Sequence, residues 1–226
     1  MKTLVVAEMT LREIARRRSV LVILALLPLA FYLTRRGDHL GQSIRFVCLG
    51  TGWALSTAAL FAGNAARGLE PRLRLSGYAT HQLVLGRLCG LWALGSALAA
   101  PYLLLIYLDQ DEFRYAPIVA IMLLTVAVAA PFGLVLSALL PRELEGTLVL
   151  LVVVGLQMMI DPATGVSRLL PFWFTREIGT YAVDHTDTGY LVRGLIQAAV
   201  VLAVLMVAVT ASAGVRLRRR PHLSTV

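Results

Sequence analysis

Six apolar segments, of which the first and fifth are short, dominate the chain and restrict it to folds that sit in a lipid bilayer. They cover residues 19–33, 43–66, 82–108, 116–140, 144–160 and 191–215. A membrane-spanning helix needs roughly 20 consecutive apolar residues. The chain is 58% hydrophobic and 15% charged, whereas about 25% of a typical soluble domain is charged. The sequence therefore predicts an all-α integral membrane protein with six transmembrane helices, in which residues 1–226 form a single transmembrane domain.

The arginines and lysines predict the orientation of these segments. If the N-terminus, the second–third loop, the fourth–fifth loop and the C-terminal tail share one side, that side holds 14 of the 21 Lys and Arg residues. The richer side is normally cytoplasmic. We therefore expect both termini to be cytoplasmic, with a basic cytoplasmic tail over residues 216–226. Usage rich in Ala, Leu, Arg and Val hints at a GC-rich bacterial genome, and hence at the inner (plasma) membrane of a bacterium.

The net charge of +8 does not predict a nucleic-acid partner. The basic residues flank apolar segments, where they set topology. A nucleic-acid interface would gather them on one polar face or domain.

Residues 1–18 predict an amphipathic N-terminal helix. Leu4, Ala7, Leu11, Ile14 and Ala15 recur at helical spacing and would form an apolar stripe. Such a helix lies in the membrane interface with its apolar face in the lipid boundary. The alternative is a solvated helical segment that leads into the first span.

Residues 161–190 follow a fifth segment that is short for a full span. This stretch is too apolar for an ordinary exposed loop, and Phe172, Trp173, Phe174 and Tyr181 suit the aromatic belt of a membrane interface. We expect an outer re-entrant hairpin, which requires its turn to be buried in protein. The alternative is an amphipathic loop that lies on the outer surface.

Motifs for catalysis and metal binding are absent from the sequence. The chain has no GxxxxGK[ST], HExxH or GxSxG. DHTD at residues 184–187 is interpreted as a solvated turn, because no Cys or further His accompanies it. We therefore expect no catalytic site, no metal site and no cofactor of its own in this chain.

The segment between the second and third spans predicts a short helix with a defined start and stop. Pro71 suits the first turn of a helix, where its missing N–H is not needed. Gly77 can end that helix, and Thr80 has a side-chain oxygen suited to cap the third span. Residues 67–80 would then be a short cytoplasmic helix joined firmly to a span.

This segment resembles a motif of a known family. RGLEPRLRLSGYATHQLVLGRLCG, residues 67–90, has an acidic residue (Glu70), a leucine-bearing helix, a small-residue turn (Ser76-Gly77) and a polar position (Thr80) before LVLGR. It is similar to the corresponding loop of ABC-2 type permeases, the membrane subunits of type V (ABCG/Wzm-like) ABC exporters. PR follows the acidic residue where the family usually has Gly-Thr, and Arg replaces the final Lys.

The resemblance implies a function. Family members are the membrane-spanning permease subunits of ATP-driven exporters, which pair with a second permease copy or a homologous permease and bind two ABC ATPase subunits. ATP and Mg are held by the ATPase, so the permease is not itself an enzyme. The second–third loop is the coupling helix that docks on the ATPase. In this chain the matching residues are Glu70, Arg72, Leu73, Arg74, Leu75, Ser76 and Gly77.

The resemblance also implies a translocation pathway at the dimer interface, lined by the first, second and fifth spans. Thr57, Asn64, Gln157 and Met158 are the candidate pathway residues in those spans. Taken alone, each polar side chain of this kind more commonly joins helices to one another.

Two other interpretations stay open from the sequence. One is a haem-exporter-like membrane component, although no haem-ligating constellation is present. The other is a non-transporting membrane scaffold or immunity protein. The loop arginines, including Arg72 and Arg74, suit acidic residues of an ATPase or anionic lipid headgroups.

Overall fold

The computed structural model describes residues 2–34, 40–109, 113–140, 142–160, 164–184 and 186–217, and every regular element within them is a helix. In chain order they are α1 (Lys2–Arg16), α2 (Arg18–Leu33), α3 (Leu40–Ala66), α4 (Glu70–Leu75), α5 (Thr80–Asp109), α6 (Tyr115–Leu139), α7 (Glu143–Met159), a 3₁₀ helix η1 (Gly165–Leu169), α8 (Phe174–Val183) and α9 (Thr188–Arg216).

Four of these helices are long and apolar enough to cross a membrane, namely α3, α5, α6 and α9. The predicted all-helical membrane architecture is confirmed to that extent. The first and fifth predicted spans correspond to α2 and α7, which have only 16 and 17 residues. Because these helices fall short of a full bilayer crossing, six complete spans remain a prediction.

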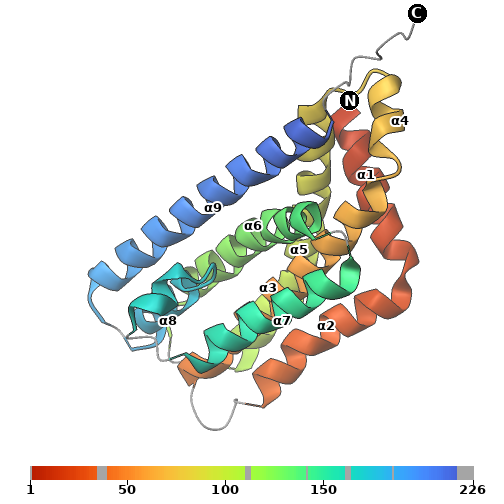
Figure 1. Ribbon diagram of the computed structural model, residues 1–226. Helices are drawn as coiled ribbons and strands as arrows, with labels where there is room; N and C mark the ends of the chain where they lie inside the picture. Colours follow the sequence, from red (N-terminus) through yellow and green to blue (C-terminus); the bar gives the residue numbers. More distant parts are fainter. Residues whose placement is uncertain are drawn as a thin grey trace, which may run out of the picture.

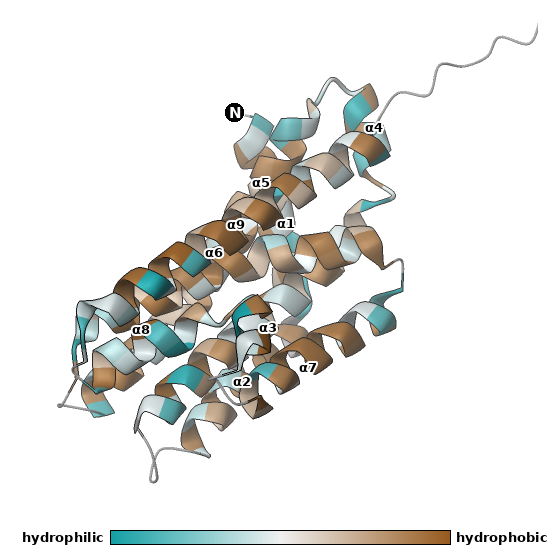
Figure 2. Cartoon of the chain, turned by 60° about the vertical axis from the view of Figure 1, so that its left-hand side comes forward, coloured by the Kyte–Doolittle hydropathy of each residue, from teal (hydrophilic) through white to brown (hydrophobic). Residues whose placement is uncertain are grey.

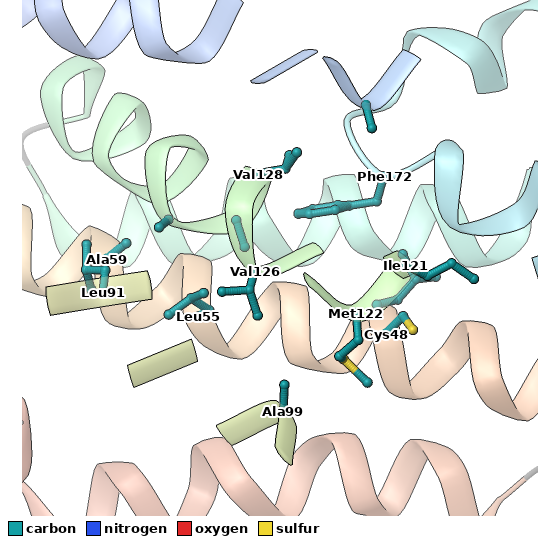
Figure 3. Close-up of a cluster of buried hydrophobic side chains, with 14 of the residues drawn as sticks. Cys48, Leu55, Ala59, Leu91, Ala99, Ile121, Met122, Val126, Val128 and Phe172 are labelled. Atoms are coloured by element: carbon teal, nitrogen blue, oxygen red, sulfur yellow. The ribbon is translucent and has the colours of Figure 1, made fainter. Parts of the chain in front are cut away.

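Helices α3 and α6 form the centre of the bundle. Both are largely buried, whereas the apolar stretches of α5 and α9 are mostly exposed. Figure 3 shows the core that α3 and α6 build with α5 and the segment before α8. The Ser56 hydroxyl donates to the Ala129 carbonyl oxygen at 3.1 Å and joins α3 to α6. A polar bond of this kind between apolar helices fixes their register.

The two ends of the bundle carry different elements. Helices α1 and α4 and the C-terminal end of α9 lie at one end, and α8 lies at the other end beside the start of α9 (Figure 1). The predicted basic tail begins at Arg216, but residues 218–226 lie outside the described part of the chain. Residues 161–163 of the predicted outer segment and His185 of the DHTD turn also lie outside it.

The outer faces of several helices are strongly apolar (Figure 2). On α7 the exposed large side chains are Leu144, Leu148, Val149, Leu151, Val152, Leu156 and Met159. Soluble monomers rarely expose contiguous apolar patches of this kind. These faces suit contact with lipid or with another membrane helix.

Candidate functional site

Helix α4 is a single short helix with a defined beginning and end. Pro71 lies in its first turn, as predicted. At its end Gly77 has φ +83°, a conformation that side chains disfavour. The Gly77 N–H donates to the Arg74 carbonyl at 3.1 Å, and the Tyr78 N–H donates to the Leu73 carbonyl at 3.1 Å. This pair of bonds is a Schellman motif, so the predicted stop at Gly77 is confirmed.

The start of α5 differs from the prediction. Thr80 is the first residue within the helix, so it cannot be the N-cap. The preceding Ala79 occupies the cap position, and its N–H donates to the Gln82 side-chain oxygen at 3.1 Å. Gln82 therefore supplies one half of a capping box, in which a Gln at the third helical position reaches back to the cap N–H.

Glu70 is buried, with 2% of its surface exposed. Its carboxylate accepts from Arg87 of α5 at 2.5 Å and from Arg216 of α9 at 2.5 Å. Sequence reasoning expected Glu70 to face an ATPase, and in this conformation it faces two arginines of its own chain instead. A buried carboxylate requires such charged partners. Glu70 therefore joins α4 to two long helices.

The other residues predicted for coupling divide into two groups. Arg72, Leu75, Ser76 and Gly77 are exposed, and Leu75 has 87% of its surface accessible. Leu73 and Arg74 are half-buried. The exposed group leaves one surface of α4 free to contact a partner.

The inward residues of α4 pack on the end of the bundle. Leu73 and Tyr78 pack against Val6, Leu83 and Leu217, which come from α1, α5 and the residue after α9. Apolar side chains at the positions of Leu73 and Tyr78 commonly pack together in a Schellman motif. The short helix is therefore held by three other parts of the chain.

Helix α1 packs closely along the start of α5. A Cβ added to Gly86 would lie 2.6 Å from the Val6 Cβ, and one added to Gly90 would lie 2.8 Å from the Ala7 carbonyl oxygen. Only glycine permits this approach, so the small-xxx-small spacing in α5 is used for helix packing. Lys2 Nζ also donates to the Gly77 carbonyl oxygen at 2.9 Å. Helix α1 is thereby tied to both α5 and α4.

The residues of the predicted apolar stripe of α1 lie in two environments. Ala7 and Ile14 are buried, but Leu4 is 72% exposed and Ala15 is exposed. The buried face is centred instead on Val6, Ala7, Thr10 and Ile14. Gly86 and Gly90 of α5 leave the space that determines which face of α1 packs there. The sequence of α1 alone does not show this face.

Sequence reasoning missed Arg87 and Arg216 as functional residues. Both lie within otherwise apolar helices, where a charge requires a partner. Glu70 is an acidic residue in a strongly basic loop, a combination that signals pairing with arginine but does not show which arginines take part.

At the opposite end of the bundle, α8 is embedded against α3, α6 and α9. Phe172, Phe174 and Ile178 are fully buried. Glu177, whose side chain is 5% exposed, accepts from Arg193 of α9 at 3.0 Å. Helix α9 thus carries an arginine paired with a buried glutamate near each of its ends.

The candidate pathway residues do not form one cluster. Asn64 lies near the end of α3, whereas the Gln157 carbonyl accepts from Arg45 near the beginning of α3 at 2.6 Å. The two residues therefore lie toward opposite ends of the bundle. The Thr57 hydroxyl donates to the Trp53 carbonyl within its own helix, and Met158 packs on the core.

Gln157 has a structural contact that sequence reasoning did not foresee. It is 2% exposed, and its side-chain oxygen accepts from the Phe172 N–H at 3.3 Å. It therefore joins α7 to the turn that leads into α8. Asn64 differs, because neither polar atom of its buried side-chain amide has a hydrogen-bond partner in the described structure. Within the described residues, Asn64 thus has two buried polar atoms without a partner, and Gln157 has one, its Nε2.

Comparison with known proteins gave no identification: no protein-family model matches this chain, and no curated protein matches it.

Proposed function

We propose that this chain is the membrane-spanning permease subunit of an ATP-driven exporter, similar to the ABC-2 type permeases. One observation carries the proposal. Helix α4 has an exposed surface at Arg72 and Leu75, and its buried side is fixed to α5 and α9 through Glu70. A short helix attached in this way suits the transfer of movement from a bound protein to long helices.

The proposed topology places α4 in the cytoplasm of a bacterial cell. The end of the bundle that carries α1 and α4 belongs to the side with 14 of the 21 Lys and Arg residues. Helices α2 and α7 would complete six spans by local thinning of the bilayer, by snorkelling of flanking residues or by association with a second subunit. Helix α1 would lie at the cytoplasmic interface, with exposed Leu4 and Met9 in the lipid boundary.

In the proposed mechanism, a separate ATPase subunit receives α4. ATP and Mg are bound and consumed on that subunit, and this chain supplies no catalytic residue. When the ATPase closes, displacement of α4 is passed through the Glu70 ion pairs to α5 and α9. Helix α9 would pass it to the outer end, where Arg193 holds Glu177 of α8.

The proposed assembly contains two permease copies, or one copy and a homologous permease, with two ATPase subunits. Helices α2 and α7 both pack against α3, and both carry exposed apolar side chains. On α3, Trp53, Thr57, Phe61 and Asn64 recur at helical spacing and form one strip. A second copy that covers these faces would leave this strip, with the unpaired Asn64 amide, along the translocation pathway.

The experiment is co-expression of the chain with the ATPase encoded beside it, followed by purification and reconstitution in liposomes. The permease alone is expected to hydrolyse no ATP, and the complex is expected to show ATPase activity that depends on both subunits. Arg72→Glu should uncouple or dissolve the complex while the chain still folds. Arg142→Glu is the matched control, since Arg142 is an exposed arginine outside α4.

Two outcomes would reject the proposal. The first is substrate movement by the purified chain down an ion gradient without any ATPase. The second is full function after Arg72→Glu, which a scaffold or immunity protein would show. Co-purification of haem or of cytochrome assembly proteins would favour the haem-exporter alternative.

A further inference from the structure

A groove lies between α1, the corner that joins α3 to α4, and α5. It encloses about 310 Å³, at the lower end of the ~300–1,000 Å³ of small-molecule sites. Its walls are formed by Val6, Met9, Thr10, Arg12, Glu13, Arg16, Ala66, Leu69, Leu73 and Arg87. The contacts of α4 and the proposed coupling to an ATPase do not account for this space.

The inner part of the groove is apolar. Val6 and Ala66 are buried in its wall, whereas Met9 and Leu69 are about half exposed at its opening. Apolar side chains therefore continue from the interior of the groove to the surface of the bundle. A wall of this kind suits an elongated hydrocarbon group that enters from the side.

The mouth of the groove carries charges of both signs. Arg12 already pairs with Glu8 at 2.5 Å, and Arg87 is neutralised by Glu70. Within the described part of the chain, Glu13 and Arg16 form no ion pair or side-chain hydrogen bond. A ligand that pairs with both residues needs an anionic group for Arg16 and, close to it, a cationic hydrogen-bond donor for Glu13.

The position of the groove supplies the source of such a ligand. Arg16 ends α1, and the apolar helix α2 starts two residues later. Under the proposed topology, this point lies at the cytoplasmic boundary of the bilayer. Basic sites between helices on that side are suited to lipid headgroups.

We propose that the groove binds a phospholipid whose head carries both a phosphate and a primary ammonium group, namely phosphatidylethanolamine. The phosphate lies at Arg16, the ammonium lies at Glu13, and part of one acyl chain lies against Val6, Met9 and Leu73. Phosphatidylglycerol lacks the cation for Glu13. The quaternary ammonium of phosphatidylcholine has no N–H to donate. The membrane placement is shared with the proposed function, but ATPase coupling is not required.

Native mass spectrometry of the purified full chain tests this directly. The chain is offered equal amounts of phosphatidylethanolamine, phosphatidylglycerol and phosphatidylcholine with identical acyl chains. Phosphatidylethanolamine should be retained roughly two- to fivefold better, the range of a partly exposed ion pair. Glu13→Gln should abolish its advantage over phosphatidylglycerol, and Arg16→Gln should weaken the binding of both. Equal retention of the three lipids by the unaltered chain overturns the proposal.

Two matched pairs separate the groove from general surface charge. Met9→Trp fills the opening of the groove and should remove the retained lipid, whereas Leu4→Trp on the exposed part of α1 should not. Glu143→Gln and Arg142→Gln alter exposed charges outside the groove and should preserve the preference. If lipid is still retained after Met9→Trp, the role of the apolar wall is overturned. Displacement of the lipid by soluble phosphoethanolamine at equal concentration would overturn it as well.

Discussion

Glu70 and Arg216 lie 146 residues apart in the sequence and form an ion pair of 2.5 Å between α4 and the last helix. Arg87 donates to the other oxygen of the same carboxylate. The three side chains join the short helix α4 to two long apolar helices. The stability of this end of the bundle and the proposed coupling both depend on this carboxylate.

We predict that Glu70→Gln destabilises the protein by about 3 kcal/mol, because it leaves two arginines without their buried counter-charge. Thermal unfolding in detergent measures the effect. Glu8→Gln removes an exposed ion pair with Arg12 and should cost less than about 1 kcal/mol. Equal effects of the two substitutions would show that the Glu70 pairs contribute no more than a surface pair.

Replacement of Gly77 by alanine should destabilise the end of α4 by roughly 1–2 kcal/mol, since a Cβ disfavours its left-handed backbone conformation. Hydrogen exchange at residues 72–80 should quicken as the Schellman bonds open more often. Gly68→Ala is the control, because an added Cβ there meets no atom within 4 Å. Unchanged exchange in Gly77→Ala would mean that the motif does not hold α4 in place.

Gly86→Val should displace α1 from α5. Even the first added carbon would lie 2.6 Å from the Val6 Cβ and 2.7 Å from the Thr3 carbonyl oxygen. Faster hydrogen exchange over residues 2–16 measures the displacement. Gly155→Val places its Cβ where no atom lies within 4 Å and should leave this exchange unaltered. If both variants behave alike, the close approach at Gly86 does not position α1.

Gln157→Leu should act on the structure of the outer segment. The substitution leaves the buried Phe172 N–H without its acceptor, which costs about 1–3 kcal/mol. Residues 164–184 should therefore exchange faster, whereas Met158→Leu should have little effect. If the substitution instead changes substrate selectivity and leaves stability unchanged, Gln157 acts in the translocation pathway and not in the structure of this segment.

The parts of the site that depend on local backbone chemistry could be predicted from the sequence. Pro71 and Gly77 determine where α4 begins and ends, because each restricts its own backbone. The pairing of Glu70 with Arg216 could not be predicted, since it joins opposite halves of the chain. The burial of Val6, Ala7, Thr10 and Ile14 of α1 within the protein was not predicted either. In a membrane protein both lipid and protein accept apolar side chains. The periodicity of apolar residues alone therefore does not show which helix face contacts lipid and which contacts protein.

Site-specific photo-cross-linking at Leu75 tests whether α4 contacts the ATPase. Leu75 is 87% exposed on α4, and Leu169 is 84% exposed on η1, in the segment that leads to α8 at the opposite end of the bundle. Each residue is replaced by p-benzoylphenylalanine in cells that also produce the neighbouring ATPase, and cross-linked products are identified by mass spectrometry. If α4 docks on the ATPase, position 75 forms a cross-link to the ATPase and position 169 forms none. A cross-link to the ATPase from position 169 alone, or from neither position, would contradict it.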